Sequence, residues 1–119
     1  MKLKFSGINI HSDEPEKTFE FYRKLGFRVL EEVPPGDKWY GAVLALQDEN
    51  DEPRIWIWRK GEEETAFCNH FVFSAGGDLD AVYQHIIAAG IACEPPFTAA
   101  WGGRELTLRD PAGNELLFL

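Results

Sequence analysis

The first half of the chain contains two different hydrophobic periods. Residues 3–11 read as a strand, and 13–16 read as a helix start, because Asp13 can cap a helix and proline is tolerated in its first turn. Apolar side chains then recur at helical spacing: Phe19, Tyr22, Leu25 and in part Phe21. Residues 25–27 end this helix and begin a strand, and two more strands are expected near 39–46 and 54–59. This half therefore predicts the order β-α-β-β-β.

The same order returns after an acidic linker at 60–65. A strand is expected at 69–74 and a helix at 78–89, and the helix has one apolar side: Leu79, Val82, Tyr83, Ile86 and Ile87. Residues 89–91 repeat the pattern of 25–27, and strands are expected near 91–94, 103–109 and 115–119. The prediction is one α+β domain, 1–119, with a first module at about 3–60 and a second at about 66–119. A module this small is marginal alone, so the two are expected to bury their sheets together or across a dimer.

Strand periodicity divides the side chains between two faces of each sheet. One face is expected under the helices and takes apolar residues: Ile8, Ile10, Ile55, Ile57, Phe71, Phe73, Leu106 and Leu108. The other face takes Phe5, Gly7, Asn9, His11, Trp56, Trp58, His70, Val72, Ser74, Glu105 and Thr107. This second face mixes aromatic and polar groups, so we expect a ligand there.

Charge and composition narrow the class of protein. The 119 residues include 20 acidic and 12 basic side chains, for a net charge of −8. This balance disfavours nucleic acid and anionic membranes as partners and suits a cationic ligand. No apolar run is long enough to span a bilayer, and Cys68 and Cys93 make no disulfide framework. We therefore expect a cytoplasmic protein in which both cysteines are small buried residues.

The most distinctive segment lies near the C-terminus. Residues 101–114 read Trp-Gly-Gly-Arg-Glu-Leu-Thr-Leu-Arg-Asp-Pro-Ala-Gly-Asn, a strand followed by turn residues, and a last strand completes a hairpin. Together with the repeat and the Phe-Tyr-Arg-Lys-Leu-Gly-Phe string at 21–27, this segment resembles the glyoxalase/bleomycin-resistance group of the vicinal oxygen chelate superfamily. The nearest resemblance is to the bleomycin-resistance-like members. It implies two curved sheets that form half-open barrels around a crevice, in a homodimer.

The resemblance also implies where a metal ion would be held. Metal-dependent members use His, Glu or Gln on the first and last strands of each module. Aligned motif to motif, these positions fall on Gly7 (or Ser6), Trp56, His70 and Leu117. Only His70 keeps a donor, and a catalytic ion needs about three. His11 and Glu115 share the right face but lie at least about 6–7 Å away along their strands. We therefore expect no cofactor and no metal site, with His70 as a hydrogen-bonded pocket residue.

Aromatic residues provide the positive signal for a ligand. The chain has four tryptophans, of which Trp56 and Trp58 share the expected ligand face. Indoles stack on planar or cationic groups, and Trp101 matches a tryptophan of the bleomycin-resistance proteins, which sequester a cationic glycopeptide. The predicted ligand-binding residues are Trp39, Trp56, Trp58, His70, Trp101 and Glu105. The loop at 33–38 does not reproduce that family's aromatic pair, so the identity of the ligand stays open.

Three hypotheses follow from these observations. The first is metal-independent binding of a small planar or cationic compound. The second is a glyoxalase-type lyase, isomerase or dioxygenase in which His70, with Glu105 or Glu115, binds Zn, Ni, Mn or Fe. The third is a structural dimer whose tryptophans fill the interface. Two roles stay open for Arg104: it binds an anion through its guanidinium group, or it pairs with a carboxylate on the surface.

Overall fold

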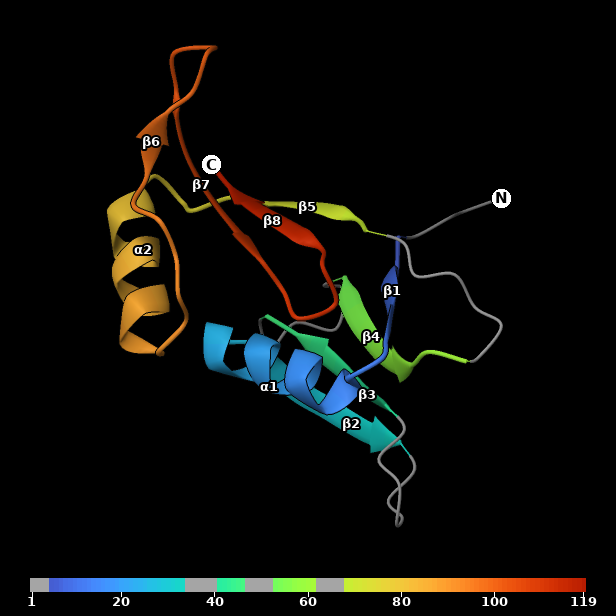
Figure 1. Cartoon of the computed structure of the whole chain (residues 1–119). Coiled ribbons are helices and arrows are strands. Elements are labelled where there is room, and N and C mark those ends of the chain that lie inside the picture. Colours follow the sequence, from blue (N-terminus) through green and yellow to red (C-terminus); the bar gives the residue numbers. More distant parts are fainter. Residues whose placement is uncertain (1–4, 34–40, 47–52, 62–67) are drawn as a thin grey trace. The chain divides into compact units, whose positions relative to one another are not determined.

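The computed structural model describes residues 5–33, 41–46, 53–61 and 68–119. The chain divides into two compact units, Met1–Ala66 and Phe67–Leu119. Within the described residues, each unit holds one helix and one four-stranded sheet of mixed direction. Figure 1 shows these elements, which belong to the α+β class expected from the sequence.

The first unit runs β1 (Gly7–Ser12), α1 (Pro15–Leu25), β2 (Arg28–Val33), β3 (Gly41–Ala45) and β4 (Arg54–Arg59). Its sheet has the strand order β1-β4-β3-β2. Strands β1 and β4 are parallel, whereas β2 with β3 and β3 with β4 are antiparallel. The first and last strands of the unit are therefore neighbours, and α1 packs along one face of the sheet (Figure 1).

The second unit repeats this plan. Its elements are β5 (His70–Phe73), α2 (Leu79–Ala88), β6 (Phe97–Thr98), β7 (Arg104–Arg109) and β8 (Glu115–Phe118). The strand order is β5-β8-β7-β6, with β5 and β8 parallel and the other pairs antiparallel. The β-α-β-β-β order predicted for both modules is confirmed.

Both helices end in the same way, as the repeated glycines predicted. Gly26 and Gly90 adopt positive φ values of 117° and 81°, a conformation that glycine reaches without strain. In each case the next residue donates its N–H back to the helix, from Phe27 to Tyr22 and from Ile91 to Ile86. This capping pattern turns the chain sharply out of each helix.

The start of α1 differs from the prediction. The N-cap is Glu14, without a side-chain cap hydrogen bond, and Asp13 instead forms an ion pair with Lys60. Ser12 takes over part of the role, because its Oγ accepts the Glu14 N–H at 3.1 Å and lies 2.9 Å from the Thr18 hydroxyl. Both hydroxyls are buried, so the pair satisfies polar atoms beneath the helix.

The core follows the predicted helix stripe and strand alternation. Tyr22 is fully buried on α1, together with Phe19 and Leu25, while Ile55 and Ile57 are buried on β4. In the second unit Leu106, Leu108, Leu116 and Phe118 are buried. On α2 the prediction is wrong for Ile87, which is 42% exposed, whereas Leu79 and Ile86 are buried.

The strand expected at 91–94 is absent, and β6 begins only at Phe97. Two prolines, Pro95 and Pro96, stand directly before it. Proline has no N–H to give to a strand ladder, so pairing with β7 begins after them. Neither α1 nor α2 has the length and apolar character of a membrane-crossing helix.

Candidate functional site

Two indoles lie on the helix-free face of the first sheet. Trp56 and Trp58 on β4 are half-buried, and they alternate with the fully or nearly fully buried Ile55 and Ile57. The register places Asn9 of β1 opposite Trp56 and His11 opposite Trp58. The predicted division of faces therefore holds in this unit, with aromatic and polar side chains together on one side.

Trp58 is held at two opposite edges of its ring. Its Nε1–H donates to Oδ1 of Asn9 at 3.0 Å. Its benzo edge lies over Gly41, where a Cβ would stand 2.5 Å from Cε3 and 3.0 Å from Cζ3 of the indole. Gly41 on β3 pairs with Trp58, so the ring reaches from β3 across its own strand toward β1. Glycine at 41 makes this close approach possible.

In the second unit, Trp101 is held by Glu105. The indole Nε1–H donates to Oε2 of Glu105 at 2.7 Å, while 67% of Trp101 remains exposed. The benzo ring folds back on Gly103, where any Cβ would overlap it. The second glycine of the 102–103 pair is therefore needed for the position of the ring. A carboxylate and an exposed indole thus form one surface.

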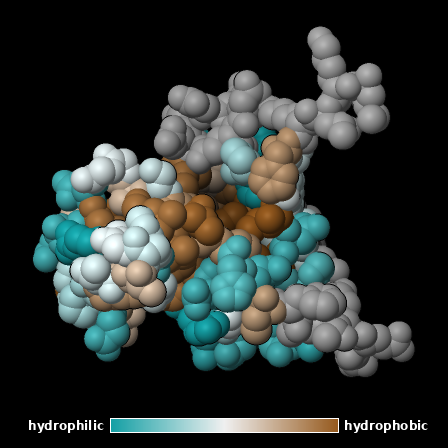
Figure 2. All heavy atoms as spheres, turned by 90° about the horizontal axis from the view of Figure 1, so that it is seen from above, coloured by the Kyte–Doolittle hydropathy of each residue, from teal (hydrophilic) through white to brown (hydrophobic). Residues whose placement is uncertain are grey.

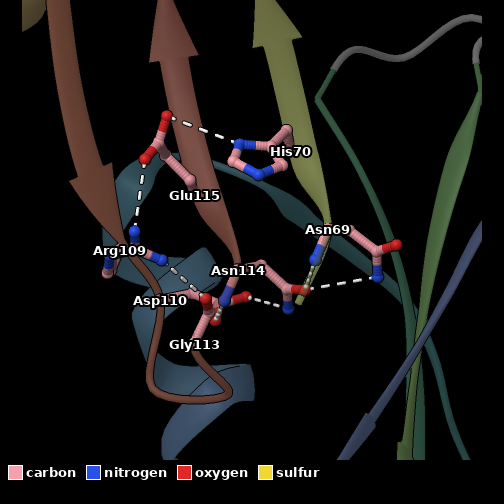
Figure 3. A network of polar contacts seen from close by, with 7 residues as sticks. All are labelled: Asn69, His70, Arg109, Asp110, Gly113, Asn114 and Glu115. Atoms are coloured by element: carbon pink, nitrogen blue, oxygen red, sulfur yellow. Dashed lines mark hydrogen bonds and ion pairs between the residues drawn. The ribbon is translucent and has the colours of Figure 1, made fainter. Parts of the chain in front are cut away.

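The predicted His70 lies in a small polar cluster on the same sheet (Figure 3). His70 Nδ1 is 3.5 Å from Oε1 of Glu115, and Arg109 Nη2 is 3.4 Å from the other oxygen of that carboxylate. These three residues occupy neighbouring positions of β5, β8 and β7. Glu105 is four residues from Arg109 along β7, about 13 Å at strand rise. His70 and Glu105 therefore belong to separate parts of the face.

The turn between β7 and β8 places this cluster. Asp110 accepts the backbone N–H groups of Ala112 and Asn114 at 2.9 Å each, and the Asn114 carboxamide donates to Asp110 at 2.8 Å. Oδ1 of Asn114 in turn accepts the Asn69 N–H at 2.9 Å, which ties the turn to the residue before β5 (Figure 3). Asp110 and Asn114 are buried. The turn motif thus sets Glu115 beside His70.

The residues that correspond to the family's metal ligands do not fit a divalent ion. Gly7 has a φ of 142°, and a Cβ there would overlap the carbonyl oxygen of Arg54 on the paired strand. That position cannot carry a ligand side chain without moving the backbone. Trp56 and Leu117 supply no suitable donor, and Glu115 already contacts Arg109. Within the residues that the structure describes, no group of three His, Cys, Asp or Glu side chains could hold a metal.

Of the two alternatives for Arg104, the structure shows the pairing with a surface carboxylate. Arg104 donates two hydrogen bonds to Asp80 of α2, at 2.9 and 3.1 Å, so it joins β7 to the helix and leaves the carboxylate of Glu105 to Trp101. These hydrogen bonds and the adjacent charge hold the pKa of Asp80 below its ordinary value.

The expected burial is wrong for Cys68, which is exposed. Cys93 is partly buried, and this burial raises the pKa of its thiol.

A groove of about 410 Å³ lies between α1 and β2, and no tryptophan is among its lining residues. It is lined by Glu16, Phe19, Glu20, Arg23, Val29 and Glu32. Glu20 is paired with Arg23, and the ring of Phe19 is buried. The groove offers charge but no exposed ring for stacking, so the indole faces are the better candidate for a planar ligand.

The structure brings some of the predicted ligand-binding residues together and separates others. Trp56 and Trp58 share one face in the first unit, and Trp101 contacts Glu105 in the second. Trp39 lies outside the described residues. The sequence placed Asn9 on the correct face but gave it no role, and Arg109 was not considered as a partner of Glu115. Alternation could assign both to a face, but only strand pairing reveals their contacts.

Apolar surface remains visible on the molecule (Figure 2). Among the described residues of the second unit, the exposed large apolar side chains include Val72, Phe97 and Leu119, which are 62%, 46% and 45% exposed. Val72 pairs with Leu117 of β8, and Phe97 pairs with Glu105 of β7. The face that carries Trp101 and Glu105 thus also has apolar positions that a ligand can cover.

Comparison with known proteins agrees with this architecture. The structure resembles TioX from Micromonospora sp. ML1, with a TM-score of 0.74, 22% identity and coverage of 98% of this chain and 97% of that one. The bleomycin-binding protein complexed with bleomycin gives a TM-score of 0.68 at 20% identity, with 98% and 97% coverage. Lactoylglutathione lyase from Agrobacterium tumefaciens gives 0.69 at 16% identity, with 98% and 91% coverage. At these identities the likeness shows the fold.

Comparison with curated protein sequences gives no match. The sequence profile of one family, however, matches residues 4–118, nearly the whole chain. That match agrees with the duplicated β-α-β-β-β units and with the turn motif that joins β7 to β8. The chain belongs to the glyoxalase/bleomycin resistance protein/dioxygenase superfamily.

Proposed function

We propose that this protein binds and sequesters a small planar or cationic compound, without a metal ion or a covalent step. Its superfamily contains both binding proteins and enzymes, and its structural neighbours include a bleomycin-binding protein and a lyase. The choice between these classes rests on the chemistry of the side chains. Here the candidate faces offer indoles and carboxylates, which attract flat and positively charged groups.

The observation that carries the proposal is the pairing of Trp101 with Glu105. An indole that is 67% exposed would ordinarily turn freely, but the 2.7 Å hydrogen bond fixes its edge. A flat cation stacked on the ring meets the electron-rich face of the indole and a carboxylate beside it. Because the ring is already oriented, less conformational entropy is lost on binding.

The electrostatics of the whole chain act in the same direction. A net charge of −8 raises the local concentration of cations and speeds their association. The effect weakens with salt, since mobile ions screen exposed charges over about 10 Å at 0.1 M. Binding of a cation should therefore weaken as the salt concentration rises, whereas stacking of a neutral ring should change little.

A titration of the purified protein with planar cations tests the proposal. N-methylacridinium is a suitable probe, because it is flat, permanently charged and fluorescent. We expect saturable quenching of tryptophan fluorescence by wild-type protein and weaker binding by Trp101→Ala. Absence of saturable binding by this probe and by bleomycin would refute the proposal and favour the hypothesis that the tryptophans fill a subunit interface. Sedimentation at several concentrations would then measure the expected homodimer directly.

A glyoxalase-type lyase, isomerase or dioxygenase is the second candidate. The 3.5 Å approach of His70 to Glu115 favours it, because these residues supply two possible ligands. The remaining positions argue against it, since Gly7 is closed to a side chain and Leu117 carries no donor. Metal analysis of purified protein separates the candidates. Tight stoichiometric Zn, Ni, Mn or Fe, lost in His70→Ala, would favour the enzyme.

A further inference from the structure

The hydrogen bond between Trp58 and Asn9 determines how the Asn9 carboxamide is oriented. An indole N–H can only donate, so the atom of Asn9 that lies 3.0 Å from Trp58 Nε1 must be the oxygen. The amide nitrogen then occupies the other branch of the group and presents two N–H donors. Asn9 is exposed, and in the described residues this is its one side-chain hydrogen bond.

The Trp58 ring is held in place beside these donors. Its benzo edge rests on Gly41 and its pyrrole edge bonds to Asn9. With both edges fixed, the ring cannot turn without losing one of these contacts. A planar compound stacked on neighbouring Trp56 would have its rim next to the carboxamide of Asn9, which pairs with Trp56 in the sheet.

We propose that Asn9 selects ligands that carry a neutral hydrogen-bond acceptor, such as a carbonyl oxygen or a ring nitrogen, on the rim of a planar ring system. This inference rests on the proposed function and adds a specificity-determining residue to it. Nδ2 of Asn9 donates to the acceptor, while Oδ1 remains bonded to Trp58. A carboxylate on the ligand would meet the negative field of the chain, so the acceptor is a neutral one.

The test uses two tricyclic probes of nearly the same shape. Acridone is neutral and carries a carbonyl acceptor, whereas N-methylacridinium is a cation without one. Their own fluorescence anisotropy reports binding. Asn9→Asp is the informative variant, because its carboxylate still accepts the Trp58 N–H but replaces the outward donor by an acceptor. We expect acridone to bind at least about tenfold more weakly to Asn9→Asp, in line with the loss of one hydrogen bond and a new repulsion.

N-methylacridinium should bind Asn9→Asp as well as wild type or better. Gln84→Glu, at an exposed position of α2 in the second unit, adds the same charge outside the sheet that carries Trp58 and Asn9, and should change the affinity for each probe less than about twofold. Trp58→Phe keeps an aromatic ring but releases Asn9, so it should weaken acridone more than N-methylacridinium. Circular dichroism confirms that each variant is folded.

The outcomes distinguish the role of Asn9 from the proposed function on which it rests. If N-methylacridinium binds wild type but acridone does not, or if Asn9→Asp binds acridone unchanged, the role of Asn9 is refuted and the proposed function stands. If neither probe binds wild-type protein, nor does bleomycin, both proposals fail together. A matching loss of acridone affinity in Gln84→Glu would also refute the role of Asn9, because the effect would then come from charge alone.

Discussion

Trp101 donates its indole N–H to Glu105 across 2.7 Å, from a loop to a neighbouring strand position four residues later. The contact fixes the edge of an indole that is mostly exposed and keeps a negative charge at that edge. A single pair therefore supplies both attractions that a flat cation can use. Substitutions at the two positions separate stacking from charge attraction.

Replacing Trp101 by alanine removes the stacking surface. We expect a loss of about 1–3 kcal/mol in the affinity for N-methylacridinium, by analogy with ring stacking elsewhere. Stability should change little, because the side chain is 67% exposed. Calorimetry of binding and urea unfolding measure the two quantities. Leu30→Ala removes a 40% exposed side chain from β2 and serves as the control that should bind normally.

Glu105→Gln tests the charge while keeping an acceptor for the Trp101 N–H. We expect weaker binding of N-methylacridinium at low salt and a smaller dependence of that binding on salt, because one attractive charge is removed. Binding of a neutral planar compound should be unaffected. Titrations at two salt concentrations check this, and an unchanged salt dependence would show that Glu105 only orients the ring.

Gly7→Ala should lower the free energy of unfolding by about 2 kcal/mol or more. Part of this cost comes from the φ of 142°, which side chains rarely adopt, and part from overlap with the Arg54 carbonyl. Gly77→Ala is a matched control, because Gly77 also has a positive φ of 86° but has nothing near its Cβ position. Urea unfolding measures the loss in free energy of unfolding for each variant, and the difference between the two losses is the steric part. Equal losses would argue against close packing at Gly7.

Asn114→Ala should destabilise the protein by about 2–4 kcal/mol, because Asp110 and the Asn69 N–H both lose a partner where Asn114 is 1% exposed. The informative comparison is Asn69→Ala. That variant loses only the 3.3 Å side-chain contact and keeps its backbone N–H bond to Asn114. The midpoint temperature of thermal unfolding should be well lower for Asn114→Ala than for Asn69→Ala. Similar midpoints would contradict a central role of Asn114.

The pair of Asp80 and Arg104 predicts a pH effect with a definite sign. Hydrogen bonds from Arg104, and then its charge, keep the pKa of Asp80 below its ordinary value of 3.8. The pair therefore stabilises the folded state above that value, and its contribution is lost as the pH falls through the lower folded-state pKa. Arg104→Gln should raise the pKa of Asp80 in an NMR titration. Because both groups are exposed, the effect on stability should be small.

The sequence by itself determined the features that depend on neighbouring residues. Hydrophobic period distinguished strands from helices, because a buried face must repeat every two or every 3.6 residues. Gly26 and Gly90 marked the helix ends, since glycine adopts the positive φ required there. The Asp-Pro-Ala-Gly-Asn string predicted the turn between β7 and β8, and alternation placed Trp56 and Trp58 on the face opposite Ile55 and Ile57.

The tertiary structure alone decided which side chains meet. Asp13 resembles a helix cap, yet Lys60 pairs with it and Ser12 bonds to the helix start instead. Residues 91–94 resemble a strand, but the prolines that follow delay pairing until Phe97. The contact of Trp58 with Asn9, 49 residues apart, follows from parallel pairing of β1 with β4. Such contacts depend on strand order and register, which the local pattern does not encode, so the sequence predicted the candidate residues and only the fold decided which of them touch.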